Sequence, residues 1–412
     1  MSLTRRYLDH AATTPILPSV VSAMTEVMAG TGNPSSLHAE GRTARRRVEE
    51  SREAVAEVLG ARPSEVIFTS GGTESNNIAL QGMWRARGGA DRRRRRIIVS
   101  AIEHSAVLDC VDALAAEGAE VVRVPVGRDG RLSLPAVQAA IEGAIQRGER
   151  GPDGADTVAY VSVMWVNNEV GTVQPVAEIV ELAHGYGIPV HTDAVQAVGH
   201  LSVNFGASGA DLASVSGHKI GGPAGVGVML ARGDAPVQPM SFGGGQERGV
   251  RSGTVATALV VGLAEALRCA EERMPEQSSR LTRLRDRLLT GAVATVPGVT
   301  PSGAWEPGDT RRRSPANAHL LVPDCESDSL LFLLDAAGIA CSTGSACHAG
   351  VPEPSHVIVA MGYSRQSARG ALRLSFGHTS TEEDVTAFLA VLPEAVERAQ
   401  RAYRASLARR IV

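Results

Sequence analysis

The sequence predicts an α/β fold in which a mostly parallel sheet is followed by a smaller α+β unit. From about residue 66 to residue 232, short apolar runs rich in β-branched residues alternate with amphipathic stretches, a pattern typical of a parallel sheet covered by helices. After about residue 315, strand and helix patterns become mixed. The length of 412 residues suits two such units better than one small core.

Seven runs supply the predicted strands of the larger unit, because each is short, apolar and enriched in β-branched residues. They are Val66–Thr69, Ile97–Ser100, Val121–Val126, Val158–Val166, Pro189–Thr192, Leu212–Val215 and Val226–Ala231. Helical spacing of apolar residues lies between several of them, at Asn77–Arg87, Ala106–Glu117 and Val176–Tyr186. Ligands of such sheets usually bind at the carboxyl ends of the strands, so polar residues there are the first site candidates.

The second half of the chain begins with two predicted helices, Val255–Glu272 and Arg280–Leu289. In the smaller unit we predict strands at His319–Val322 and Ala371–Ser375 and helices at Ser327–Ala336 and Thr381–Tyr403. Three segments are predicted to be exposed loops, because Pro, Gly or Arg dominate them. These are Thr300–Pro315, Arg87–Arg96 and Gln146–Asp156.

The composition is that of an ordinary globular protein, with 43% hydrophobic and 21% charged residues. A net charge of −3 favours neither a nucleic-acid nor a membrane partner, and no apolar run approaches the ~20 residues of a membrane span. No apolar segment follows Arg5 and Arg6, so we expect no secretory signal. Five cysteines do not make a disulfide framework, and we expect a reducing, cytoplasmic location.

The run Arg92–Arg96 is the most concentrated charge in the sequence. It could contact a phosphate backbone, but no aromatic residues are interleaved for base stacking. Such runs are more often solvated loops, so we do not expect direct nucleic-acid binding.

Lysine is almost absent from this arginine-rich chain. Lys and Arg together number 41, and Lys219 is the single lysine. An amine can form a Schiff base, whereas a guanidinium effectively never loses its proton. Lys219 follows a predicted strand, in Ser216-Gly217-His218-Lys219. It is therefore a candidate for lysine-specific chemistry, against the alternatives of chance and of a surface loop lysine.

Two further strand ends carry polar residues suited to a cofactor. At Thr69–Ser75, a strand runs into Gly71, Gly72 and Thr73 before a helix, which would place free backbone N–H groups around a phosphate; the alternative is a plain turn with Thr73 as helix N-cap. Asp193 ends another strand and could pair with a protonated pyridine nitrogen, or simply cap the next helix.

His104 and Cys347 are the remaining candidates. His104 follows the strand at Ile97 and could stack on a ring or move protons, although a loop histidine is the plainer interpretation. Cys347 lies among small and polar residues that predict an exposed loop, where packing poorly explains a cysteine. Cys341 is closer to an apolar stretch and is interpreted as structural. A metal site from Cys341, Cys347 and His348 fits no standard zinc spacing.

Together these blocks resemble the cysteine desulfurases of the class V aminotransferase family, which are fold type I enzymes that use pyridoxal phosphate (PLP). The resemblance runs from Tyr7–Pro15 to the region of Arg373, and its blocks stand in family order. Besides those already quoted, they are Gly32–Ser36, Val166–Gly171, His191–Gln196, Gly243–Arg248 with Arg251–Thr254, and Ser342–Cys347. The Ser342–Cys347 loop is similar to that of the first desulfurase group, the iron–sulfur assembly and nitrogen-fixation type.

The resemblance implies a role for each matching residue. Lys219 carries the cofactor, Cys347 is the nucleophile that accepts sulfur from L-cysteine, and His104 stacks on the ring and assists proton transfer. The cofactor phosphate is bound by Gly72, Thr73, Ser216 and His218, and Thr254 reaches it from the partner subunit. Asp193 pairs with the pyridine nitrogen, and Gln196 contacts the phenolic oxygen. Asn168 lies beside cofactor and substrate, and Arg373 holds the substrate carboxylate.

The resemblance also implies an organisation and partners. A large PLP-binding domain would cover residues 16–262, and residues 1–15 with 263–412 would form a small domain carrying the cysteine loop. We expect a homodimer and a sulfur-acceptor protein such as an iron–sulfur scaffold or a thiolation enzyme. In some relatives the loop cysteine also helps to hold an iron–sulfur cluster, so Cys347 is a candidate ligand of a shared cluster.

Three positions differ from many relatives: Trp165 stands where relatives often have histidine, His378 stands where many have arginine, and Cys341 adds a thiol near the loop. None removes a catalytic group, and the sulfur acceptor stays open. One alternative function is selenocysteine lyase; a second is another class V aminotransferase or lyase in which Cys347 is idle. A third is a nonenzymatic scaffold or nucleic-acid partner that uses Arg92–Arg96.

Overall fold

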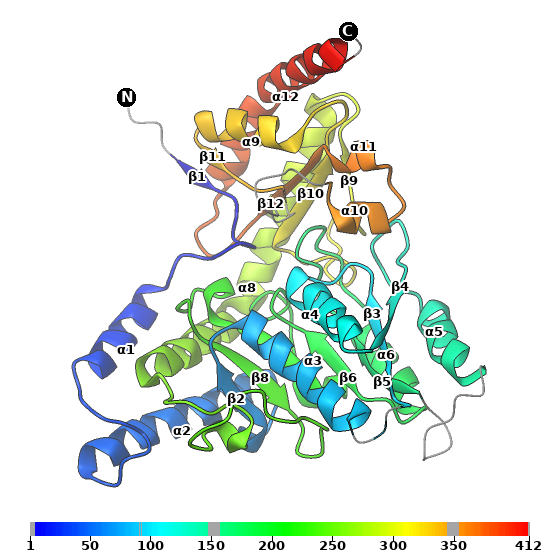
Figure 1. The fold of residues 1–412 in the computed structure, drawn as a ribbon. Coiled ribbons are helices and arrows are strands. Elements are labelled where there is room, and N and C mark those ends of the chain that lie inside the picture. Colours follow the sequence, from blue (N-terminus) through cyan, green and yellow to red (C-terminus); the bar gives the residue numbers. More distant parts are fainter. Residues whose placement is uncertain (1–4, 90, 92, 147–156, 344–353, 411–412) are drawn as a thin grey trace.

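A seven-stranded sheet forms the centre of the larger part of the molecule (Figure 1). The computed structural model describes residues 5–89, 91, 93–146, 157–343 and 354–410. The strand order is β2-β8-β7-β6-β5-β3-β4, and all neighbouring pairs are parallel except those that β8 makes with β2 and β7. The strands are β2 Val66–Thr69, β3 Arg96–Ser100, β4 Glu120–Val124, β5 Val158–Ser162, β6 Val190–Asp193, β7 Leu212–Ser216 and β8 Gly227–Ala231.

All seven predicted strands are present, and the mostly parallel sheet is confirmed. Two predicted runs extend too far: Val121–Val126 passes the end of β4 by two residues, and the run predicted to reach Val166 is longer still, because β5 ends at Ser162 and the chain then turns through the site. Successive side chains of one strand face opposite sides, so Ile97 and Val99 contact one hydrophobic cluster while Ile98 contacts the other. Burial on both faces explains why these strands are almost continuously apolar.

Helices cover both faces of this sheet (Figure 1). Apolar residues of α3 and α4 pack on one face, and those of α1, α2, α5, α6, α7 and the first half of α8 pack on the other. The sequence patterns located α3, α4 and α6 but not α1, α2 or α5. The bounds are α1 Pro18–Met28, α2 Ala39–Leu59, α3 Gly72–Gly88, α4 Ser105–Ala116, α5 Leu134–Gln146, α6 Val176–His184, α7 Phe205–Ser208 and α8 Thr257–Thr295.

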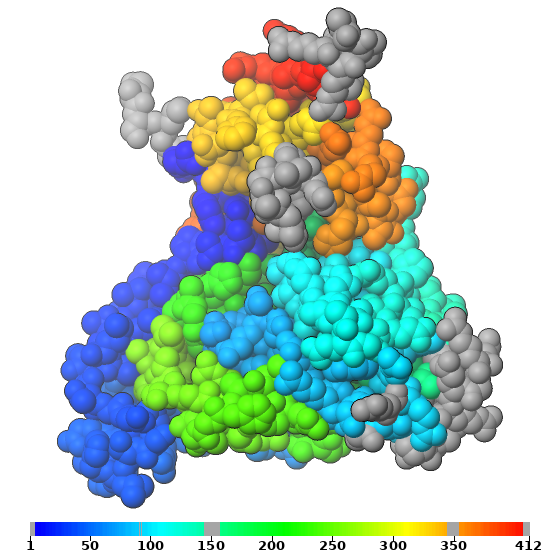
Figure 2. Space-filling view, in the orientation of Figure 1, coloured from blue at the N-terminus to red at the C-terminus, as the bar shows by residue number. Residues whose placement is uncertain are grey.

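A second, smaller part lies beyond the carboxyl ends of the parallel strands (Figures 1 and 2). Its antiparallel sheet has the order β12-β10-β9 and packs against α9, α12 and the second half of α8. The N-terminal strand β1 pairs with β11, so the beginning of the chain joins this part. The elements are β1 Arg6–Tyr7, β9 Thr300–Pro301, β10 Asn317–Leu321, α9 Ser327–Ala336, β11 Ile339–Ala340, α10 His356–Ala360, α11 Arg365–Ala368, β12 Ala371–Ser375 and α12 Glu382–Arg410.

The helix α8 connects the two parts and corrects one prediction. The two helices expected at Val255–Glu272 and Arg280–Leu289 are one continuous helix with Pro275 inside it. Proline removes one backbone hydrogen bond, but the helix is buried on both sides of it: Leu267 packs into the larger core and Leu281 into the smaller one. Tertiary packing therefore outweighs the local break. The predicted domain boundary after residue 262 falls inside α8, and the division into domains stays a prediction.

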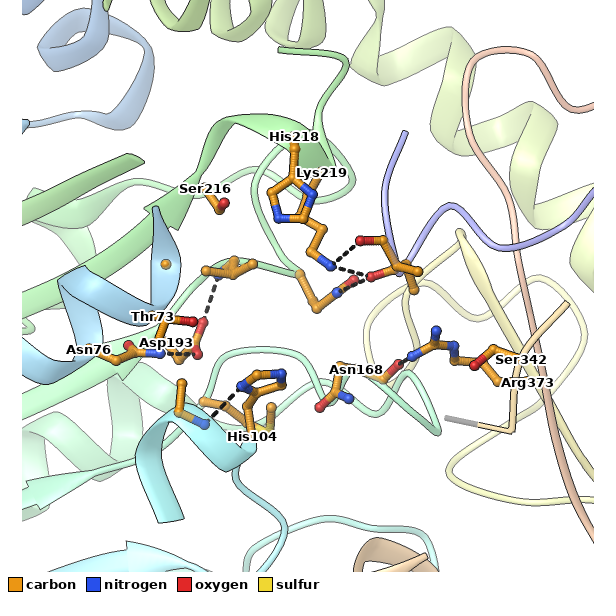
Figure 3. A pocket seen from close by; sticks show the side chains of 17 residues that line it. Thr73, Asn76, His104, Asn168, Asp193, Ser216, His218, Lys219, Ser342 and Arg373 are labelled. Carbon is orange, nitrogen blue, oxygen red and sulfur yellow. Dashed lines mark hydrogen bonds between the residues drawn. The ribbon is translucent and has the colours of Figure 1, made fainter. Parts of the chain in front are cut away.

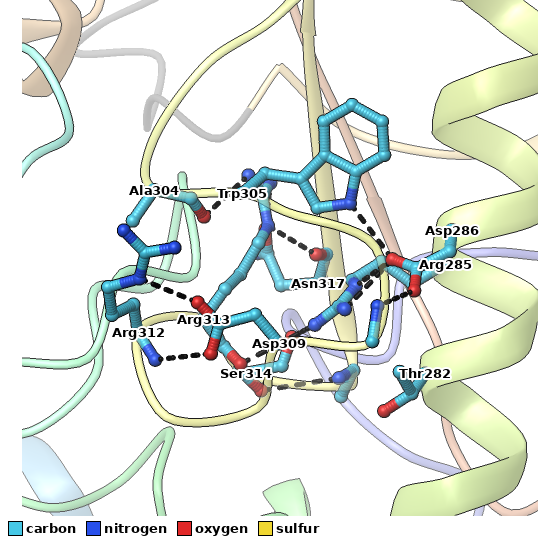
Figure 4. Close-up of polar contacts among 12 residues, drawn as sticks. Thr282, Arg285, Asp286, Ala304, Trp305, Asp309, Arg312, Arg313, Ser314 and Asn317 are labelled. Carbon is cyan, nitrogen blue, oxygen red and sulfur yellow. Dashed lines mark hydrogen bonds and ion pairs between the residues drawn. The ribbon is translucent and has the colours of Figure 1, made fainter.

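The predicted exposed loop Thr300–Pro315 is the second correction, because Ser302, Ala304, Arg313 and Ser314 are buried, and polar contacts tie this loop to α8 (Figure 4). The Arg313 side chain is 0% exposed and donates to the carbonyl oxygens of Ser302 at 2.7 Å and Asn317 at 3.0 Å. Arg285 of α8, also fully buried, donates to the Ser314 carbonyl oxygen and pairs with Asp286. The two guanidinium groups therefore fasten the loop to the small core.

The arginine run also differs from a uniformly solvated loop. Arg93 and Arg95 are exposed, but Arg94 and Arg96 are buried, and Arg96 begins β3 and pairs with Glu120 at 2.7 Å. Arg92 and most of the predicted loop Gln146–Asp156 lie outside the described residues. Over the ranges given above, no helix has both the length and the apolar character needed to cross a membrane.

Candidate active site

A cavity of about 400 Å³ opens at the carboxyl ends of the parallel strands, facing the small part (Figure 3). Ten of the residues singled out in the sequence line it together, although they come from distant segments. These are Gly72, Thr73, His104, Asn168, Asp193, Gln196, Ser216, His218, Lys219 and Arg373. Thr254 is exposed and does not line this cavity, and Cys347 lies outside the described residues.

Lys219 projects into the cavity from the short 3-10 turn Gly217–Lys219 that follows β7. The turn is tight: a Cβ added at Gly217 would lie 2.9 Å from the Pro223 carbonyl oxygen. The ammonium Nζ donates to the carbonyl oxygens of Ala11 at 2.5 Å and Ala12 at 2.7 Å. Burial, and next the nearby positive charge of Arg373, lower the pKa of Lys219 from 10.5 to about 8. The single lysine is thus a weakly basic amine inside a cavity.

Asp193 ends β6 and is held from two sides. Its Oδ2 accepts a hydrogen bond from Asn76 Nδ2 at 2.7 Å, and its Oδ1 accepts one from the Val195 N–H at 2.9 Å. Only 5% of Asp193 is exposed. A buried carboxylate fixed in this way can contact a cationic ring nitrogen without reorganising.

The amino end of α3 forms an anion cradle beside Asp193. The helix begins at Gly72 after Gly71, which has φ +151°, and no side chain caps it. A Cβ on Gly72 would lie 2.7 Å from the Val195 side chain, so glycine is required there. Thr73 lies inside the helix, which rules out its alternative role as N-cap. The first N–H groups of a helix have no partner within the helix, and Ser216 and His218 line the same cavity, so a phosphate would find several donors here.

His104 lies near Asp193, at the amino end of α4. Its Nδ1 accepts a hydrogen bond from the Ala106 N–H at 3.1 Å, so the side chain caps α4. Burial lowers the pKa of His104, and it also lowers that of His218, to about 4. The preceding Glu103 is 0% exposed and accepts the Met164 N–H at 2.7 Å; burial raises its pKa well above the usual range.

Arg373 enters the cavity from β12, on the small part. Its Nη2 donates to Asp9 Oδ1 at 2.9 Å, and its Nη1 donates to the Asn168 carbonyl oxygen at 3.1 Å. The backbone N–H of Arg373 donates to the Ser342 carbonyl oxygen, and the Ser342 N–H donates to the Arg373 carbonyl oxygen. The substrate-binding candidates Asn168 and Arg373 therefore lie next to each other, joined across the two parts of the molecule.

The segment that leads to Cys347 is described only up to Thr343. Cys341 precedes it, and burial raises the pKa of this thiol to about 12, so Cys341 is a poor nucleophile. This supports the structural role predicted for it. Among the residues that the structure describes, no three His, Cys, Asp or Glu side chains are grouped to hold a metal; the cluster-ligand prediction falls on Cys347 and is not tested.

Sequence reasoning missed several contacts of the site. Asp9, Ala11 and Ala12 hold Arg373 and Lys219, and Asn76 holds Asp193. The block Tyr7–Pro15 contains the first three, and Asn76 directly follows the block Thr69–Ser75. No periodicity or spacing, however, assigns a residue a partner more than a hundred positions away.

Known proteins resemble this chain over nearly its whole length. The model of the aminotransferase class-V family matches residues 6–388. An IscS-like cysteine desulfurase of Mycobacterium tuberculosis is 53% identical over 397 residues, which is 96% of this chain and 97% of that protein. The cysteine desulfurase IscS of Clostridium botulinum is 39% identical over 393 residues, covering 95% and 94%.

Solved structures agree with the sequence matches. A NifS-like protein superposes with a TM-score of 0.83 at 34% identity, covering 96% of this chain and 100% of the other. DndA from Streptomyces lividans gives a TM-score of 0.70 at 38% identity, covering 90% and 99%. With these matches and the geometry of the cavity, the chain belongs to the aminotransferase class-V family and, within it, to the cysteine desulfurases.

Proposed function

We propose that this chain is a PLP-dependent enzyme that converts L-cysteine to L-alanine and transfers the sulfur to Cys347 as a persulfide. The observation that carries the proposal is the single lysine, Lys219, inside a cavity that Asp193 and Arg373 also line. Relatives named cysteine desulfurase cover nearly all of the chain. Of the predicted site residues that the structure describes, all except Thr254 line this cavity.

The residues present fit PLP. The amino end of α3 with Thr73, Ser216 and His218 would hold the phosphate, and Asp193, already fixed by Asn76, would face the pyridine nitrogen. His104 would lie on the ring, and Gln196 would reach the phenolic oxygen. When bound, PLP supplies a conjugated ring that withdraws electrons from the substrate Cα.

Other side chains of the cavity bind the substrate and transfer protons. Arg373 binds the substrate carboxylate, with Asn168 beside it. The amine of Lys219, with its pKa lowered to about 8, accepts the Cα proton near neutral pH and can return a proton to carbon. His104 adds its ring and a polar contact; its Nδ1 is engaged with Ala106.

Cys347 accepts the sulfur atom of the substrate. Its thiolate attacks the sulfur of the substrate, a new S–S bond forms, and the bond between that sulfur and the substrate Cβ breaks. The electron pair of the broken bond stays with carbon, which takes up a proton to give alanine. No external oxidant is needed, and the persulfide is later passed to an acceptor.

The proposal includes a homodimer. Thr254 is exposed and lies outside the cavity of its own chain, which suits a residue that completes the partner's phosphate site. Gel filtration that finds a fully active monomer would refute this part. The sulfur acceptor is a protein such as an iron–sulfur scaffold or a thiolation enzyme, and Cys347 would be the place where a shared cluster is held.

The test uses purified protein and a visible spectrum. The wild type should be yellow, and L-cysteine should yield alanine and, with a reductant, sulfide. Lys219→Ala should lose the visible band that arises from linkage to lysine, and Cys347→Ser should keep that band but lose sulfide release. Cys325→Ser is the matched control, because that thiol is buried in the small core. A colourless protein that cannot take up PLP would overturn the proposal.

A further inference from the structure

The segment Asp9–Ala12 holds both cations of the cavity. The carbonyl oxygens of Ala11 and Ala12 accept the Lys219 ammonium, and the Asp9 carboxylate accepts Arg373 Nη2 at 2.9 Å. Gln196 Nε2 also donates to the Ala11 carbonyl oxygen at 3.0 Å. An N-terminal stretch outside the parallel sheet therefore forms one wall of the site.

The position of Asp9 is fixed by its backbone rather than by its side chain. Asp9 forms a parallel bridge with Ser375, two residues after Arg373 on β12. The Ser375 N–H donates to the Leu8 carbonyl oxygen at 2.8 Å, and Ser375 Oγ accepts the Ala11 N–H at 2.8 Å. Since the backbone is anchored on both sides, the carboxylate is set against the guanidinium before any substrate arrives.

The hydrogen-bond inventory of Arg373 shows what this contact leaves free. A guanidinium has five N–H donors, one on Nε and two on each Nη. Nε is buried and has no partner among the described residues. Asp9 takes one N–H of Nη2, and the Asn168 carbonyl oxygen takes one of Nη1. Among the described residues nothing else accepts from the two Nη groups, so one N–H on each Nη is left, and a carboxylate bound by two parallel hydrogen bonds needs two.

We propose that Asp9 is a positioning residue for substrate recognition: it holds Arg373 so that its two remaining Nη donors face the carboxylate of the amino acid. Only 6% of the Arg373 side chain is exposed, so water does little to orient it. Without Asp9 the guanidinium keeps, among the described residues, one hydrogen bond, to the Asn168 carbonyl oxygen, and can rotate about its terminal bonds. A displacement of about 1 Å at a positioned group can cost roughly a hundredfold.

Two other roles of Asp9, competition with the substrate and stabilisation of the fold, predict different effects on ligand binding. If Asp9 competed with the substrate for Arg373, its removal would tighten the binding of amino acids. If Asp9 only stabilised the fold, its removal would weaken every ligand equally. A positioning role predicts weaker binding of ligands that carry a carboxylate and unchanged binding of amines that do not.

The experiment measures the binding of L-alanine and of ethylamine to the PLP-loaded enzyme by the change in its visible spectrum. Ethylamine has the same amine and methyl group but no carboxylate. The variants are Asp9→Ala, which loses the contact, and Asp9→Asn, which keeps an acceptor oxygen and the shape. Asp335→Ala is the control, because Asp335 pairs with Arg5 on the exposed surface of the same small part.

We expect Asp9→Ala to weaken L-alanine binding by roughly tenfold to a hundredfold, Asp9→Asn to weaken it less, and Asp335→Ala to leave it unchanged, with ethylamine binding the same in all four proteins. Unchanged or tighter L-alanine binding in Asp9→Ala, or equal loss for ethylamine, would overturn the inference. If Asp9→Ala does not fold, the ratio of the two affinities in Asp9→Asn decides in the same way.

The inference rests on the proposed function, but the two fail differently. A wild type that binds no PLP gives no spectrum and refutes the function. A yellow wild type whose Asp9 variants bind both ligands normally refutes only the role of Asp9. Thermal melting of the cofactor-free variants gives a readout that is independent of the loaded enzyme: we expect Asp9→Asn to melt within a few degrees of the wild type.

Discussion

The lowered pKa of Lys219 can be measured directly, because the chain has no other lysine. In the cofactor-free protein, burial lowers the pKa of this amine from 10.5 to about 8. At pH 8 about half of it would then be neutral, against about 0.3% for an ordinary lysine. An amine-specific reagent should therefore label Lys219 on the order of a hundredfold faster than a lysine that is equally accessible to the reagent but has the ordinary pKa.

The assay follows the rate of labelling against pH, with the product located by mass spectrometry on the peptide that contains Lys219. This step is needed because the N-terminal amine titrates in the same range. Arg373→Met should raise the midpoint, because the arginine charge lowers the pKa of Lys219. A midpoint near 10.5 in the folded wild type would show that burial does not lower the pKa of Lys219.

The same shift predicts how stability depends on pH. The unfolded chain binds the proton with a pKa near 10.5 and the folded chain with one near 8. Between these values the unfolded state holds more protons, so the free energy of unfolding should rise with pH. The full effect is about 3 kcal/mol, measured in cofactor-free protein as the difference between the wild type and Lys219→Met. A difference that falls as pH rises would have the wrong sign.

Three further outcomes follow from other contacts. Arg313→Ala should lower the free energy of unfolding by about 3–5 kcal/mol, because it leaves buried carbonyl groups without donors; urea denaturation measures this, and a loss below 1 kcal/mol would contradict the burial argument. Asn76→Ala removes a donor to Asp193 and should weaken PLP binding roughly tenfold, by titration of the apoprotein; unchanged affinity would remove Asn76 from the site. Cys341→Ala should keep sulfide release, because burial raises the pKa of that thiol to about 12; a loss as complete as that of Cys347→Ser would contradict this.

The strands of the large sheet could be predicted because burial on both faces makes each of them continuously apolar, as in β3 and β5. The break expected near Pro275 was wrong because packing at both ends of α8 outweighs the missing hydrogen bond. The burial of Arg313 was missed for a related reason. A run rich in Pro, Gly and Arg looks solvated in sequence, and only the fold reveals the carbonyl groups that satisfy the guanidinium.

Some residues of the candidate site could be predicted from the sequence and others could not. Lys219, Asp193 and the glycines at the start of α3 could be found because they stand at strand ends, where an α/β sheet places its ligands. Asp9 and Asn76 could not be assigned, because their partners lie 364 and 117 positions away. Contacts of that range depend on how the two parts of the molecule meet.

Sulfur transfer to Cys347 is tested most directly by a single turnover of L-cysteine on the purified, PLP-loaded protein, with no reductant and no acceptor. Alanine should form in an amount equal to the active sites, and the peptide containing Cys347 should gain the mass of one sulfur atom. The persulfide should be absent from Cys347→Ser and present in Cys341→Ala. Alanine formed without any sulfur on Cys347 would rule out sulfur transfer to this thiol.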